Sequence, residues 1–165
     1  MKYWILIALI LLSGCGYQPA SHFAQNGVGE SVSTEVVVLM EDPQNTVIIK
    51  DAVDRAVITK FRSALVSKSA SKTHLKIGVE SVSFTPVRYN TDGYIITYRT
   101  SVVMKTDMIT GEQIKTYRTK GLYDFAIEPN AIITDQARFE AIREGAQKGI
   151  DSFIAQVVAE GAHSK

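Results

Sequence analysis

Residues 94–107 read YIITYRTSVVMKTD, a stretch rich in β-branched and aromatic side chains and free of glycine and proline. This composition is typical of a β-strand. At about 3.4 Å per residue, a strand of this length reaches roughly 48 Å, which is longer than a compact sheet of this size needs. We therefore expect a long strand whose ends project beyond the rest of the domain.

Turn sequences flank this stretch on both sides. Residues 88–93 (RYNTDG) precede it and residues 110–112 (TGE) follow it, and both contain the glycine and polar residues that tight turns favour. The segments beyond these turns, residues 75–84 and 113–127, also have strand-like composition. Together the three segments predict a meander of strands with two projecting tips.

The first strand of this meander contains a change of phase. An extra residue near Glu80 and Ser81, a β-bulge, explains the change. Pro86 is expected to close the strand, because proline has no N–H to donate to a sheet. The apolar positions that alternate and then shift are Leu75, Ile77, Val79, Val82 and Phe84.

Two other segments have the period of a helix. Apolar residues recur at spacings of three and four between residues 46 and 68, which predicts a helix of about 20 residues with Asn45 as its N-cap. The same spacing from Thr134 onward predicts a C-terminal helix. The apolar stripe of the first helix comprises Ile49, Ala52, Val53, Ala56, Val57, Phe61, Ala64 and Leu65. The stripe of the second comprises Ala137, Ala141, Ile142, Ala146, Ile150, Phe153, Ile154, Val157 and Val158.

The order of these elements indicates the fold class. Residues 34–40 (TEVVVLM) predict one further strand, which ends at the turn residues 41–43. The resulting order β-α-β-β-β-α predicts an α+β fold with two helices on one face of a four-stranded, mostly antiparallel sheet. We expect this single domain to occupy residues 34–160, followed by a tail at 161–165.

The N-terminus predicts a lipoprotein signal peptide in residues 1–14. Lys2 precedes ten uncharged residues, YWILIALILL, which are too few for a membrane-spanning helix of about 20 residues but fit the apolar region of a signal peptide. Residues 12–15 (LSGC) match the lipobox, in which the cysteine thiol receives diacylglycerol before cleavage. The alternative is an ordinary secretory signal beside a chance cysteine, but Cys15 is the only cysteine. We expect lipid attachment at Cys15.

The mature chain is expected to be one domain on a tether. Removal of residues 1–14 leaves 151 of the 165 residues, a length suited to one domain, and residues 15–33 are rich in small polar residues that predict a flexible tether. A lipidated Cys15 leaves no thiol for a disulfide. The loss of Lys2 balances the basic and acidic residues at 17 each, so no net charge attracts nucleic acid. Gly16, in the place where aspartate often signals inner-membrane retention, favours the outer membrane.

Catalytic and metal-binding patterns are missing from the sequence. The histidines, His22, His74 and His163, are too far apart to share a helix face, so we expect no metal site and no cofactor. There is no nucleophile elbow or phosphate-binding loop, and we expect no enzyme. Glu140 and Glu144 are spaced for acid and base roles, but this spacing on an amphipathic helix is more typical of a solvated face.

Aromatic and basic residues are concentrated in the strand region. One interpretation is that such residues simply suit the wet face of a half-buried sheet. The other is a partner surface, since tyrosine and arginine are frequent interface anchors and arginine binds phosphate. The residues concerned are Tyr94, Tyr98, Arg99, Lys105, Lys115, Tyr117, Arg118, Lys120 and Tyr123.

Short motifs in the same order along the chain resemble the LptE lipoproteins of lipopolysaccharide assembly. The resemblance covers essentially the whole mature chain, although each motif alone is short. The motifs are the Cys15-Gly16-Tyr17 start, the Asp42-Pro43 turn, a helix with Arg55-Ala56-Val57, the hairpin 88–93 before a tyrosine-rich strand, and an alanine-rich final helix.

This resemblance implies a fold, a partner and a lipid contact. Members of the family place two helices on a four-stranded sheet, plug the lumen of the outer-membrane barrel LptD, and catalyse nothing. A basic residue at the tip between the second and third strands is thought to meet lipopolysaccharide, and Arg88 occupies that place. A second basic position follows the fourth strand, where this chain departs from the pattern with residues 129–131 (PNA). Lys115, Arg118 and Lys120 are the candidates to replace it.

The resemblance also implies a barrel interface on the tyrosine-rich strands, which would include Tyr94, Tyr98, Arg99, Tyr117 and Tyr123. The expected location is the outer membrane, on its periplasmic side or inside the barrel lumen. A different class remains open, in which the chain is a periplasm-facing lipoprotein that serves a transporter and binds lipid between sheet and helices.

Overall fold

The computed structural model describes residues 28, 30–38, 46–61, 64–129 and 131–163. The predicted signal peptide, the lipid attachment at Cys15, most of the tether and the N-cap at Asn45 lie outside these residues. The elements are β1 (Val32–Val38), α3 (Thr46–Phe61), the short 3-10 helix η2 (Lys68–Ala70), β2 (Thr73–Tyr89), β3 (Ile95–Thr110), β4 (Gln113–Ala126) and α4 (Asp135–His163).

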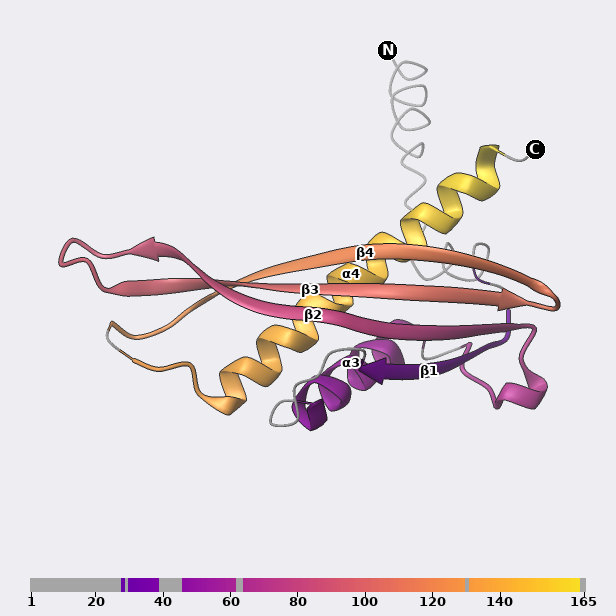
Figure 1. Cartoon of the computed structure of the whole chain (residues 1–165), viewed down its shortest axis with the longest axis horizontal. Coiled ribbons are helices and arrows are strands. Elements are labelled where there is room, and N and C mark those ends of the chain that lie inside the picture. Colours follow the sequence, from indigo (N-terminus) through magenta and orange to yellow (C-terminus); the bar gives the residue numbers. More distant parts are fainter. Residues whose placement is uncertain (1–27, 29, 39–45, 62–63, 130, 164–165) are drawn as a thin grey trace, which may run out of the picture.

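The four strands form one sheet in the order β1-β2-β3-β4. β1 runs parallel to β2, whereas β2, β3 and β4 form antiparallel pairs. Both helices contact the sheet and each other, and α4 crosses the strands diagonally (Figure 1). The predicted α+β class, the element order and the two-helix, four-strand composition are therefore confirmed.

β1 and α3 both differ from the predicted boundaries. β1 begins at Val32, so Val32 and Ser33 are strand residues and not part of the tether, and Val28 is also buried. The predicted helix over residues 46–68 was too long, since α3 ends at Phe61. The stripe residue Ala64 is buried beyond the helix, where its carbonyl accepts a hydrogen bond of 2.7 Å from the Val32 N–H. Pairing with the start of β1 competes with further helical hydrogen bonds.

β2 contains the predicted bulge but does not end where the sequence suggested. The register with β3 shifts between Val79 and Ser81, which confirms the bulge. The strand then continues past Pro86 to Tyr89, so the prediction that proline closes it was wrong. β1 pairs with β2 only as far as Val79, and beyond that residue no other described residue pairs with the outer edge of β2. A missing N–H is tolerated at an edge.

The two long hairpins extend the sheet in opposite directions. The β2–β3 hairpin projects beyond both helices at one end, and the β3–β4 turn lies at the other (Figure 1). Gly93 and Gly111 lie in these turns with φ of +83° and +60°, which glycine adopts without steric cost. β1 starts beside Thr73, at the β3–β4 end. The β2–β3 tip is therefore the end of the sheet that lies far from the start of the domain.

The core lies between the sheet and the two helices. Ile77, Val79 and Met104 from the sheet and Val53 and Phe153 from the helices are almost fully buried there. α4 approaches β4 closely where Gly145 and Gly149 face Gly121. Within the described ranges, neither helix is long and apolar enough to span a membrane.

Candidate functional site

One face of the sheet points away from both helices. Alternation along β4 places Arg118, Lys120, Leu122 and Asp124 on this face, which we call the open face. The register aligns them with Arg99 to Lys105 of β3. In the part of the chain that the structure describes, no helix covers this face.

Ion pairs between neighbouring strands order the open face. The Arg99 guanidinium donates two hydrogen bonds of 2.7 Å to the Asp124 carboxylate, and these bonds hold the pKa of Asp124 below its usual value. Arg118 Nε lies 2.7 Å from Glu80 Oε2 at the β2 bulge. Paired charges of this kind keep the face polar and define the positions of its long side chains.

Tyr98, Tyr117 and Tyr123 lie on the helix side of the sheet and not on the open face. Of the two interpretations of the sequence, the one that places these tyrosines and the arginines on a single partner surface was therefore wrong for these three residues. Tyr117 is only 6% exposed. Its ring packs edge-on against Phe153 at 5.2 Å between centroids, and its hydroxyl donates to Glu160 at 2.9 Å. Burial and this hydrogen bond raise the pKa of Tyr117 to about 12. The side chain is therefore part of the packing under α4.

Tyr98 and Tyr123 also point toward the helices. The Tyr98 ring stacks on Phe125 with centroids 6.1 Å apart, and Lys148 Nζ of α4 lies 5.2 Å from the Tyr123 ring centroid. The alternation of residues along β4 could have predicted this separation from the sequence. Tyr117 and Tyr123 have odd numbers on β4, whereas Arg118 and Lys120 have even numbers, and alternate residues of a strand face opposite sides.

The four basic residues considered for the lipid contact are also separated. Lys115 lies on the helix side, 3.6 Å from Glu160. Arg118 and Lys120 lie on the open face near the middle of the sheet. Arg88 pairs with Thr97 of β3, which in turn pairs with Ala126 of β4. Measured along β4 from Ala126, Lys120 is roughly 20 Å away and Lys115 about 37 Å away. No single phosphate group can contact them together.

Arg88 is exposed and lies between two irregularities near the end of β2. The register with β3 shifts on both sides of it. The turn beyond is built around Asn90, whose Oδ1 accepts hydrogen bonds from the N–H groups of Asp92 at 3.1 Å and Tyr94 at 2.8 Å. Arg88 pairs with Thr97, which has the same parity on β3 as Arg99, so Arg88 lies on the open-face side of the hairpin. Among the described residues Arg88 forms no ion pair.

A pocket that sequence reasoning missed lies at the same tip. It has a volume of about 260 Å³ and is lined by Tyr89, Gly93, Tyr94, Ile95, Tyr98 and Ala131. Ala131 belongs to the segment between β4 and α4, so the pocket joins the hairpin to that segment. Tyr89 is next to the predicted lipid contact Arg88 in the sequence, but only the fold brings Ala131 to the same pocket as Tyr89.

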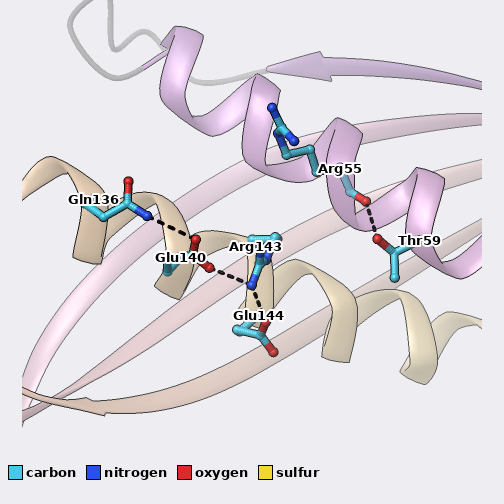
Figure 2. Close-up of polar contacts among 6 residues, drawn as sticks. All are labelled: Arg55, Thr59, Gln136, Glu140, Arg143 and Glu144. Carbon is cyan, nitrogen blue, oxygen red and sulfur yellow. Dashed lines mark hydrogen bonds and ion pairs between the residues drawn. The ribbon is translucent and has the colours of Figure 1, made fainter.

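The carboxylates Glu140 and Glu144 on α4 share one partner. Arg143 lies 2.6 Å from Glu140 and 3.0 Å from Glu144, and Gln136 donates to Glu140 at 3.1 Å (Figure 2). On α3, the Thr59 hydroxyl donates to the Arg55 carbonyl at 2.8 Å. Both carboxylates are thus engaged in a network along the helix surface. No group of three potential metal-ligating side chains occurs in the described ranges.

Comparison with solved structures shows a shared fold. The chain resembles a candidate lipoprotein from Caulobacter crescentus with a TM-score of 0.51 at 11% identity, over 86% of this chain and 97% of that one. Rare lipoprotein B from Shewanella oneidensis has a TM-score of 0.48 at 12% identity, over 80% and 97% of the two chains. No family model and no curated protein sequence matches. The chain therefore has the fold seen in the Caulobacter protein.

Proposed function

We propose that this chain is an outer-membrane lipoprotein that plugs or supports a β-barrel of the LptD type and assists lipopolysaccharide transport to the outer leaflet, without a catalytic step of its own. The observation that carries the proposal is the long sheet with one polar, ion-paired face left open by the helices. The lumen of a large barrel is polar and hydrated, so such a face suits it. The sequence motif at Cys15 supports the lipid anchor.

Among the residues predicted for the barrel interface, the exposed ones are those that we propose to contact the barrel. Arg99 lies on the open face and Tyr94 is exposed at the tip, so both can contact a partner. Tyr117 and Tyr123 are packed under α4. We propose that the barrel contact consists of the open-face residues, including Leu122, which is exposed among charged neighbours.

The alternative, a transporter accessory that holds lipid between sheet and helices, has less support. An alanine methyl group at Gly121 would overlap the Gly145 carbonyl of α4, so the backbones are already in contact at that crossing. Val102 and Met104 fill the space beside it and are almost fully buried. An acyl chain would have to displace this packing.

Co-purification from solubilised outer membrane tests the proposal. The wild-type chain should co-purify with a large β-barrel protein at a molar ratio of one to one. Leu122→Arg on the open face should reduce this yield by at least tenfold, while Ile58→Arg on the exposed side of α3 should leave it unchanged. A monomer that carries extractable phospholipid and no barrel would favour the transporter alternative and reject the plug.

The lipid anchor gives a first prediction. Cys15→Ala removes the only thiol that can be acylated, so the signal should remain uncut by the lipoprotein peptidase. Incorporation of a radiolabelled fatty acid into the chain should be abolished. Persistent labelling of the variant would show that the lipid is attached elsewhere.

Arg88 gives a second prediction. If its guanidinium meets a phosphate of lipopolysaccharide, the charge-assisted contact is worth about 1.5–3 kcal/mol, so its loss should weaken binding by roughly tenfold or more. Arg88→Asp should weaken binding further through repulsion, and Arg88→Lys should restore part of it, since an ammonium keeps the charge without the forked geometry. The measurement is lipopolysaccharide binding to the purified mature chain at two salt concentrations.

The matched control for Arg88 is Lys72→Asp, which makes the same charge change at the other end of the sheet. Its effect on lipid binding should be at most twofold, because screening removes most long-range effects at physiological salt. Barrel co-purification should survive each Arg88 variant. Equal binding by wild type and Arg88→Asp would remove Arg88 from the mechanism.

A further inference from the structure

The tyrosine pocket at the β2–β3 tip is built from two separate parts of the chain. Tyr89, Tyr94 and Tyr98 come from the hairpin, and Ala131 comes from the segment that leads into α4. Tyr98 is held in place because its ring stacks on Phe125 of β4. The pocket is therefore lined by three tyrosines of the hairpin, of which Tyr98 is fixed by a ring of β4.

The lining determines which ligands fit. None of the lining residues among those described carries a charge, so a phosphate or carboxylate would find no counter-ion there. Its volume of about 260 Å³ lies below the roughly 300–1,000 Å³ of sites that take drug-sized ligands. The pocket fits a single neutral ring.

The exposure of the pocket distinguishes a polar ring from an acyl chain. Tyr89 and Tyr94 are 55% and 45% exposed, so a ligand bound there keeps contact with water. An acyl chain gains binding energy from complete removal of its surface from water, which this open pocket does not provide. Tyrosine combines an apolar ring face with a hydroxyl that forms hydrogen bonds. That combination suits a sugar, which has C–H groups on its ring faces and hydroxyls around its edge.

From the three lining tyrosines, the small uncharged pocket and its open mouth, we infer that the β2–β3 tip has a binding site for one neutral saccharide ring. The site is separate from Arg88, which pairs with Thr97 on the open face, whereas the neighbouring Tyr98 points to the helix side. The hairpin can thus recognise a sugar on one side and an anionic group on the other.

Only the identity of the natural ligand rests on the proposed function: under that function the ligand is the saccharide part of a glycolipid. The site itself depends on the pocket and not on the barrel. If the chain did not co-purify with a barrel, the proposed saccharide site would be unaffected. If the saccharide did not bind, the proposed barrel function would be unaffected.

The test is a titration of the purified mature chain, followed by NMR of the tyrosine rings, with two probes. The first is N,N′-diacetylchitobiose, a neutral disaccharide without an acyl chain, and the second is monomeric dihexanoylphosphatidylcholine, a lipid without sugar. The disaccharide should shift the Tyr89 and Tyr94 resonances and saturate at millimolar concentrations. The lipid should shift neither.

Substitutions make the result specific. Tyr89→Ala and Tyr94→Ala should each weaken disaccharide binding by at least fivefold, and Tyr94→Phe, which keeps the ring and loses the hydroxyl, by about threefold. Val87→Ala is the matched control, because Val87 is exposed on the same hairpin outside the pocket lining, and it should change binding by less than twofold. Both tyrosines are exposed, so the fold should be retained.

Three outcomes would overturn the inference. The first is a wild-type chain whose tyrosine resonances do not respond to the disaccharide. The second is equal disaccharide binding by wild type and both alanine variants. The third is a response to the short-chain lipid alone, which would reassign the pocket to acyl chains.

Discussion

Replacement of Gly121 with alanine is expected to lower the free energy of unfolding by at least about 3 kcal/mol, at the upper end of the range for overpacked sites. The added methyl group would overlap the carbonyl oxygen of Gly145 and lie 2.6 Å from the backbone nitrogen of Gly149. Both are backbone atoms of α4, so no side-chain rotation can relieve the overlap. The helix would have to move away from β4, and the melting temperature should fall by about 6–12 °C.

Two further glycine substitutions on α4 act as graded controls. In Gly149→Ala the new methyl group meets the terminal methyl of Met104, a flexible side chain that can move, so the cost should be smaller than at Gly121. Gly161→Ala meets nothing within 4 Å and should stabilise the helix by up to about 1 kcal/mol. If urea denaturation gave the same midpoint for Gly121→Ala and wild type, the close approach of α4 and β4 would be refuted.

Phe61→Ala is expected to cost about 3–5 kcal/mol, because it removes a large buried ring and leaves a cavity. Phe61 is 3% exposed and belongs to the same core cluster as Val53 and Val57 on α3. The measurement is the free energy of unfolding in urea, with the slope of the transition checked for constancy.

Ile58→Ala is the matched control for this substitution. Ile58 lies on the same helix but is more than half exposed, so its truncation should cost less than about 0.5 kcal/mol. Lys60 is a poorer control, because its ammonium lies 2.7 Å from Asp151 of α4 and links the two helices. Equal losses for Phe61→Ala and Ile58→Ala would contradict the packing of α3 on the sheet.

The order of elements was predictable because each element has its own period. Alternation with one shift located β2 and its bulge, and spacings of three and four located both helices. The α4 prediction from Thr134 agrees closely with the observed start, where the Thr134 hydroxyl accepts a hydrogen bond of 3.2 Å from the Ala137 N–H. The errors in element boundaries arose where residues far away in the sequence determine the end of a helix or strand. Residues 64 and 66, beyond the end of α3, bond to Val32, and β2 passes Pro86 where, among the described residues, only β3 pairs with it.

The candidate site was predictable only in part. Arg88 is exposed near the β2–β3 tip, as expected, but it lies within β2 and not in the predicted turn over residues 88–93, which the structure builds around Asn90. The shared aromatic and basic surface was not found in the structure, since Tyr117 and Tyr123 face α4 while Arg118 and Lys120 face away. Strand parity in the sequence could have indicated this separation. Nothing local could have indicated that Ala131 would complete a pocket with the tyrosines of the hairpin.

The sequence by itself determined the α+β class, the order of the strands and helices, and the turn chemistry of both tips, because these depend on periodicity and on the backbone preferences of nearby residues. Only the tertiary structure decided which face of the sheet stays open, which tyrosines become core and how Gly121 meets Gly145 and Gly149. The physical reason is that a sheet with apolar residues on one face gains its stability by burying that face. The helices α3 and α4 settle there, and the residues of opposite parity remain exposed.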